Sequence, residues 1–110
     1  AVQTGMGFHA SIASSKGAIE GLTRSLAAEF SSFKIRVNAI APSLTQTPLA
    51  GALLNSPEKI EAGGKRHPLG RVGQSEDVAN LATFLLNPAN SWITGQIIGV
   101  DGGIGSLRTS

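Results

Sequence analysis

Two stretches of the chain carry apolar residues at helical spacing. In Ser11–Phe30 the apolar positions recur every three or four residues, which predicts an amphipathic helix. Gly17 and Gly21 form a stripe of small residues on this helix that would let a neighbouring element approach closely. In Ser75–Leu86 a similar pattern follows two acidic residues in the first turn, and Ser75 is the expected cap. The pattern therefore predicts two amphipathic helices far apart in the sequence.

Two other stretches have the pattern of strands. Lys34–Ile40 alternates polar and β-branched residues and then becomes apolar, and Ile93–Val100 is rich in β-branched residues. Trp92, just before the second stretch, is expected to pack in the core or at a subunit contact. Residues 43–70 have no strong periodicity over most of their length. A long stretch of this kind is typical of a lid over a binding site, so we expect a substrate lid at residues 43–70.

Composition narrows the class of protein. The chain has 110 residues, enough for one domain over residues 1–110, and it contains no Cys and only two His. We therefore expect neither disulfides nor a metal site. The net charge of +2 is spread along the chain without interleaved aromatic residues, which argues against nucleic-acid binding. No apolar run is long enough to span a membrane, and the sequence predicts a soluble cytoplasmic protein.

Five motifs in order resemble the short-chain dehydrogenase/reductase family. The segment FHASIASSKGAIEGLTR looks like the active-site helix of that family, and NAIAPS looks like its N-A-[IV]-x-P-G strand end. Further similar pieces are Thr47-Pro48, the stretch PLGRVGQSEDVANLATFLL, and TGQ followed by VDGG. Together these pieces cover nearly the whole chain. The resemblance implies a three-layer, Rossmann-like α/β fold, of which this chain is the C-terminal half of a doubly wound parallel sheet in a βαβαβ order.

The resemblance also implies what to expect of the remaining parts of the fold. Ala1–Thr4 resembles the tail of a preceding strand. The family's Gly-rich turn that holds the cofactor pyrophosphate has no counterpart here, and the family's catalytic Ser would precede Ala1, so we expect a truncated form of the fold. Such a form leaves an unpaired sheet edge and an apolar face, which predicts a homo-oligomer, a dimer or tetramer, or a complex with the complementary N-terminal half.

Site residues follow by the same resemblance. The family uses a Tyr and a Lys four residues apart on one helix face, so that the Lys lowers the pKa of the phenol and binds the nicotinamide ribose. Here Lys16 is present, but Ile12 occupies the Tyr position and the chain has no Tyr. His9, three residues before Ile12, is an alternative base. The resemblance assigns the loop at the nicotinamide end of the cofactor to four further residues, Pro42, Ser43, Thr45 and Thr47.

Two of these residues depart from the family pattern. Ser43 stands where the family has Gly, and Thr45 where it has Ile or Val.

Three interpretations of function remain open. The family catalyses hydride transfer between NAD or NADP and an alcohol or carbonyl substrate. Because Ile12 has no ionisable proton, we expect this chain by itself to be inactive, with or without a bound cofactor. The alternative is a non-catalytic oligomerisation or interaction module derived from the same fold, and a third interpretation is a piece of a longer enzyme.

Overall fold

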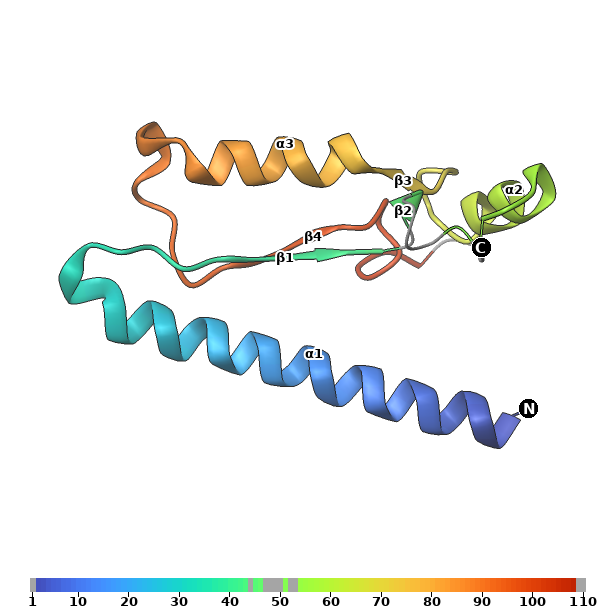
Figure 1. Cartoon of the computed structure of the whole chain (residues 1–110), viewed down its shortest axis with the longest axis horizontal. Helices are drawn as coiled ribbons and strands as arrows, with labels where there is room; N and C mark the ends of the chain where they lie inside the picture. Colours follow the sequence, from blue (N-terminus) through green and yellow to red (C-terminus); the bar gives the residue numbers. More distant parts are fainter. Residues whose placement is uncertain (1, 44, 47–50, 52–53, 109–110) are drawn as a thin grey trace. The chain divides into compact units, whose positions relative to one another are not determined.

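The computed structural model describes residues 2–43, 45–46, 51 and 54–108 (Figure 1). Contacts divide the chain into two compact units, Ala1–Ala39 with Ser91–Ile97, and Ile40–Asn90 with Ile98–Ser110. In the described ranges, no helix has the length and apolar character that crossing a membrane requires. In chain order, the elements are α1 (Val2–Phe30), η1 (Ser31–Phe33), β1 (Ala39–Pro42), β2 (Thr45–Gln46), α2 (Pro57–Lys65), β3 (Gly73–Gln74), α3 (Ser75–Leu86), η3 (Pro88–Asn90) and β4 (Ile97–Val100).

Helix α1 dominates the first unit. It starts at Val2, so the prediction of a strand at Ala1–Thr4 is wrong over its described residues. No proline interrupts the stretch, so every backbone N–H after the first turn can donate within the helix. Thr23 and Ala27, one turn apart, are buried on the same face. The helix gives way to η1 and then to Lys34, whose left-handed backbone, with φ 59°, reverses the chain.

Strands β1 and β4 begin later than the sequence pattern predicts. The predicted starts were Lys34 and Ile93, whereas β1 begins at Ala39 and β4 at Ile97. Before those points one backbone bond, from the N–H of Gly95 to the carbonyl of Val37 at 2.8 Å, is accompanied by side-chain hydrogen bonds to the backbone. The Asn38 amide nitrogen donates to the carbonyl of Ile93, and its oxygen accepts from the backbone N–H of Gln96. These side-chain bonds stand in place of part of the regular ladder, and Gly95 has a positive φ, 73°, that a strand residue does not adopt.

The described strands form two pairs. Strands β1 and β4 are neighbours in one two-stranded sheet. The N–H of Ala39 donates to Gln96 O at 2.8 Å and the N–H of Ser43 to Val100 O at 3.4 Å, a succession that makes the pair parallel. Strands β2 and β3 form a second parallel pair. Parallel strands joined through helices confirm the predicted α/β class, a partial Rossmann-like fold.

In the second unit, α3 has the predicted bounds, Ser75–Leu86. Its cap is different from the prediction, because Gln74 rather than Ser75 precedes the first turn and shares a capping box with Asp77. Helix α2 begins with Pro57 at its first position, after Ser56, whose hydroxyl accepts from the N–H of Lys59 at 3.2 Å. Proline therefore starts this helix and does not interrupt it.

Few apolar side chains are buried among the described residues. They are Ala27 in the first unit and Leu54, Val72 and Leu85 in the second. Trp92, in the first unit, is 98% exposed, so the prediction that it packs in the core is wrong, while its place at a subunit contact stays a prediction.

Candidate functional site

The predicted site residues fall in both compact units. Ile12 and Lys16 lie one turn apart in α1, in the first unit, and Lys16 is exposed. Pro42, Ser43 and Thr45 lie in the second unit, at and just beyond the end of β1. Thr47 lies outside the described residues. The structure thus brings Ser43 and Thr45 together, and we treat the second unit by itself.

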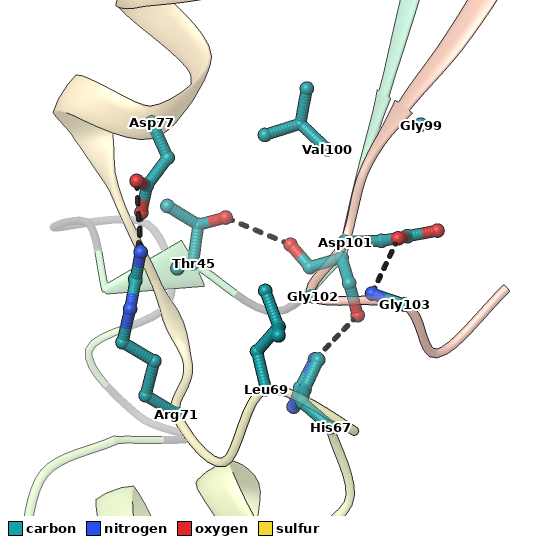
Figure 2. A pocket seen from close by; sticks show the side chains of 12 residues that line it. Thr45, His67, Leu69, Arg71, Asp77, Gly99, Val100, Asp101, Gly102 and Gly103 are labelled. Atoms are coloured by element: carbon teal, nitrogen blue, oxygen red, sulfur yellow. Dashed lines mark hydrogen bonds and ion pairs between the residues drawn. The ribbon is translucent and has the colours of Figure 1, made fainter. Parts of the chain in front are cut away.

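Ser43 and Thr45 line a cavity of about 360 Å³ (Figure 2). The Thr45 hydroxyl donates to the carbonyl of Ser43 at 2.9 Å, which fixes the turn that follows β1. The carboxyl ends of β1 and β4 supply one wall of the cavity, and the segment from His67 to Asp77 supplies the other. In open parallel sheets, ligands bind beyond the carboxyl ends of the strands, and this cavity lies at that edge.

His67 makes the most specific contacts in the cavity wall. Its side chain is buried, with 5% of the residue exposed, and both ring nitrogens have partners. Nδ1 lies 2.7 Å from the carbonyl oxygen of Gly63, and Nε2 lies 2.9 Å from the Ser43 hydroxyl. Because a carbonyl can only accept, Nδ1 carries a proton, and in the neutral ring Nε2 accepts from the Ser43 hydroxyl. The structure therefore joins a hydroxyl, an imidazole and a carbonyl in one chain of hydrogen bonds.

A charged pair closes another side of the cavity. The Arg71 guanidinium donates to both carboxylate oxygens of Asp77, at 2.8 and 3.0 Å, as Figure 2 shows. The backbone N–H of Gln74 donates to the same carboxylate at 2.7 Å. These hydrogen bonds, with that of Arg71 the largest, hold the pKa of Asp77 at about 2, below its ordinary 3.8. The charge of Arg71 is thus paired with that of Asp77.

The turn Asp101-Gly102-Gly103 completes the wall. The Asp101 carboxylate accepts from the N–H of Gly103 at 2.9 Å, and both glycines have positive φ, 61° and 93°. A Cβ on Gly102 would lie 3.4 Å from the Cβ of His67. A Cβ at Gly102 would therefore lie in van der Waals contact with the His67 side chain, while the positive φ would strain the backbone.

The sequence motifs identified part of this site. Ser43 and Thr45 were predicted binding residues, and Arg71, Asp77 and Asp101 stand inside the quoted motifs without an assigned role. The contact of His67 with Ser43 was missed, because the 24 residues between them give no local pattern. In the part of the chain that the structure describes, no cluster of three or more His, Asp or Glu side chains could hold a metal ion.

Comparisons with known proteins give matches to reductases and dehydrogenases. A family model described as enoyl-(acyl carrier protein) reductase matches residues 1–105. A tropinone reductase homolog of Arabidopsis thaliana is 52% identical over 88 residues, which are 80% of this chain and 33% of that protein. The chain therefore spans about a third of the length of this curated relative.

Solved structures of dehydrogenases also match this chain. A short-chain type dehydrogenase/reductase from Mycobacterium ulcerans is 43% identical, with a TM-score of 0.75, over 84% of this chain and 34% of that one. A putative 2-deoxy-D-gluconate 3-dehydrogenase from Agrobacterium tumefaciens, with bound NADP, is 39% identical, with a TM-score of 0.76. That match covers 86% of this chain and 38% of the other.

Proposed function

Because the chain belongs to the short-chain dehydrogenase/reductase family, we propose that it forms the nicotinamide and substrate side of an NAD(P)-dependent oxidoreductase fold. The observation that carries the proposal is the cavity at the carboxyl end of β1, where Ser43 and Thr45 lie side by side. The proposed substrates are alcohols or carbonyl compounds. The bound NADP of the Agrobacterium structure supports the choice of cofactor class but does not distinguish NAD from NADP for this chain.

Each predicted residue has a proposed role in this arrangement. Pro42, Ser43, Thr45 and Thr47 would contact the nicotinamide end of the cofactor, and Lys16 would bind its ribose. Residues 43–70 would cover the substrate, and the described part of that segment includes β2 and α2. A single domain over residues 1–110 and a cytoplasmic location remain proposals of the same kind.

We also propose that the 110-residue chain alone neither oxidises alcohols nor reduces carbonyl compounds. In the family, a phenol one turn before the Lys exchanges the proton, and Ile12 carries no ionisable group. Hydride transfer leaves an alkoxide that must be protonated, so the missing phenol removes that step. The Ile12→Tyr variant restores a phenol one turn from Lys16 in α1.

Saturation-transfer NMR with NADH and NADPH tests the binding proposal, because it detects weak ligands. We expect the nicotinamide protons to receive more saturation than the adenine protons, and Thr45→Ala to reduce the signal. Ser31→Ala, an exposed site in the other unit, is the matched control. Stronger adenine saturation, or a Thr45→Ala signal equal to that of the wild type, would contradict the proposed contact.

A second candidate function is an oligomerisation or interaction module. Ile19 and Leu22 in α1 are 57% and 58% exposed, and Trp92 in the same unit is almost fully exposed. Apolar side chains of this size are usually covered by a partner when they gather on one surface. The proposed partner is a second copy of the chain or a complementary N-terminal half. Light scattering of wild type and Leu22→Glu checks the homo-oligomer, because a folded wild-type monomer at micromolar concentration would exclude it.

A further inference from the structure

The hydrogen-bond chain from Ser43 through His67 to Gly63 has the geometry of an activated hydroxyl. A nucleophilic Ser needs a neutral base within hydrogen-bond reach and a third group that orients the base. The Ser43 Oγ to His67 Nε2 distance of 2.9 Å meets the first requirement. The Gly63 carbonyl, 2.7 Å from Nδ1, meets the second and selects the tautomer with a free lone pair on Nε2.

The position of His67 is fixed by several independent contacts. Its backbone N–H donates to Gly64 O at 3.0 Å, and its carbonyl accepts from the N–H of Gly70 at 2.8 Å. Gly102 lies beside the ring, and a Cβ built on it would be 3.6 Å from Cδ2 of His67. A base held in this way is already oriented toward the Ser43 hydroxyl, so little conformational freedom has to be lost before the proton is transferred.

The hydroxyl is open to small molecules, because both Ser43 and His67 line the cavity of about 360 Å³. Ser43 is only partly buried, at the point where β1 ends and the chain turns. This hydroxyl is also a departure from the family strand end, in which the same position is Gly. The dehydrogenase pattern therefore does not account for the hydroxyl.

The charges around the cavity select the class of substrate. Asp77 and Asp101 both line it, and the guanidinium of Arg71 is already paired with Asp77. The cavity wall therefore has more negative than positive charge, which disfavours the binding of an anion. Leu69 and Val100 add apolar surface on which a short acyl chain can lie. An uncharged ester with a short acyl group fits both features.

We propose that Ser43 is a nucleophile, activated by His67, that accepts the acyl group of small uncharged esters in this cavity. Oγ bonds to the ester carbonyl carbon while its proton passes to Nε2 of His67. The ester C–O bond then breaks, and the departing oxygen takes that proton from the imidazole, leaving acyl-Ser43 and an alcohol. Water attacks the acyl group with His67 again as base, which releases the carboxylic acid and restores the hydroxyl.

The experiment uses p-nitrophenyl acetate and the 110-residue chain without NAD or NADP, so its result does not depend on the proposed dehydrogenase function. We expect release of p-nitrophenolate, an acetyl adduct in the intact mass, and the adduct mapped to Ser43. Ser43→Ala should abolish this adduct, His67→Gln should slow its formation about 100-fold, and Ser31→Ala should leave it unchanged. No adduct at Ser43, or equal acetylation rates in wild type and folded His67→Gln, would overturn the proposal.

A second measurement keeps the test decisive if His67→Gln fails to fold. The chain has no Cys, so Ser43→Cys introduces a single thiol beside His67, and Ser31→Cys introduces a matched exposed thiol. Because the imidazole can take the thiol proton and the resulting imidazolium stabilises the thiolate, iodoacetamide should alkylate the thiol of Ser43→Cys at least tenfold faster than that of Ser31→Cys near pH 6. Its rate should depend less steeply on pH than that of the control. Identical pH profiles for the two thiols would overturn the proposal.

Discussion

Gly64 is the position at which the structure makes the sharpest prediction about stability. It lies near the end of α2, is buried, and a Cβ built on it would lie 3.0 Å from the carbonyl oxygen of Gly70. The same Cβ would lie 3.2 Å from the Cα of Arg71. Both neighbours are backbone atoms, which cannot turn away as the end of a flexible side chain can. Gly64→Ala therefore has to move the chain between α2 and β3.

The size of the effect is the difference between two opposing terms. Replacing Gly by Ala within a helix stabilises it by about 1 kcal/mol. Forcing an extra methyl into a filled space costs about 1–3 kcal/mol. The expected net result is a loss of about 1 kcal/mol in the free energy of unfolding, which lowers Tm by about 4–8 °C in a domain of this size.

Urea and thermal unfolding followed by circular dichroism provide the assay. Ala62→Gly is the control, because Ala62 is exposed in the same helix and its replacement removes only the helix preference, about 1 kcal/mol. A Gly64→Ala variant that is more stable than wild type, by about the amount that Ala62→Gly loses, would refute the steric argument. Since Gly64 O accepts from the N–H of His67, Gly64→Ala should also slow acetylation of Ser43.

Three further predictions concern stability. Val72 is buried, so Val72→Ala should lower the free energy of unfolding in urea by about 2 kcal/mol. The control is Leu86→Ala at an exposed site, which should change the free energy of unfolding by less than about 0.5 kcal/mol. The pKa of Asp77 is lowered to about 2, so its carboxylate adds stability above about pH 4 that is lost as the pH falls toward 2. The difference in urea midpoint between wild type and Asp77→Asn should therefore shrink over that interval, and a constant difference would contradict the role of Arg71. Lys34→Gly relieves a left-handed backbone and should raise Tm by a few degrees in a thermal scan.

Local signals in the sequence were sufficient for the helix at Ser75–Leu86. Its first turn contains Glu76 and Asp77, and Pro88 follows soon after the last turn, so the start and the end are both marked. The identity of the cap was not predictable in the same way. Ser75 is a common cap residue, but the Asp77 carboxylate bonds the backbone N–H of Gln74, and that bond selects Gln74.

Strand boundaries depended on contacts between distant parts of the chain. Lys34–Ile40 has an alternating pattern, but Asn38 binds backbone groups 55 and 58 residues away, at Ile93 and Gln96. Those side-chain bonds replace part of the ladder before β1, which begins at Ala39. A pattern of polar and apolar residues contains no information about such a partner. The existence of the strands was therefore predictable, and their first residues were not.

The site shows how the family motifs and this chain's own residues combine. The turn Asp101-Gly102-Gly103 is part of the quoted family pattern, and in this structure Gly102 lies beside the imidazole of His67. Ser43, which departs from the same pattern, supplies the hydroxyl that this imidazole contacts. A Gly at position 43 would leave Nε2 of a buried His without this partner, and a methyl group at position 102 would contact the same side chain from a strained backbone. The two positions are therefore coupled through His67, so the effects on stability of Ser43→Gly and Gly102→Ala should be non-additive in a double-mutant cycle.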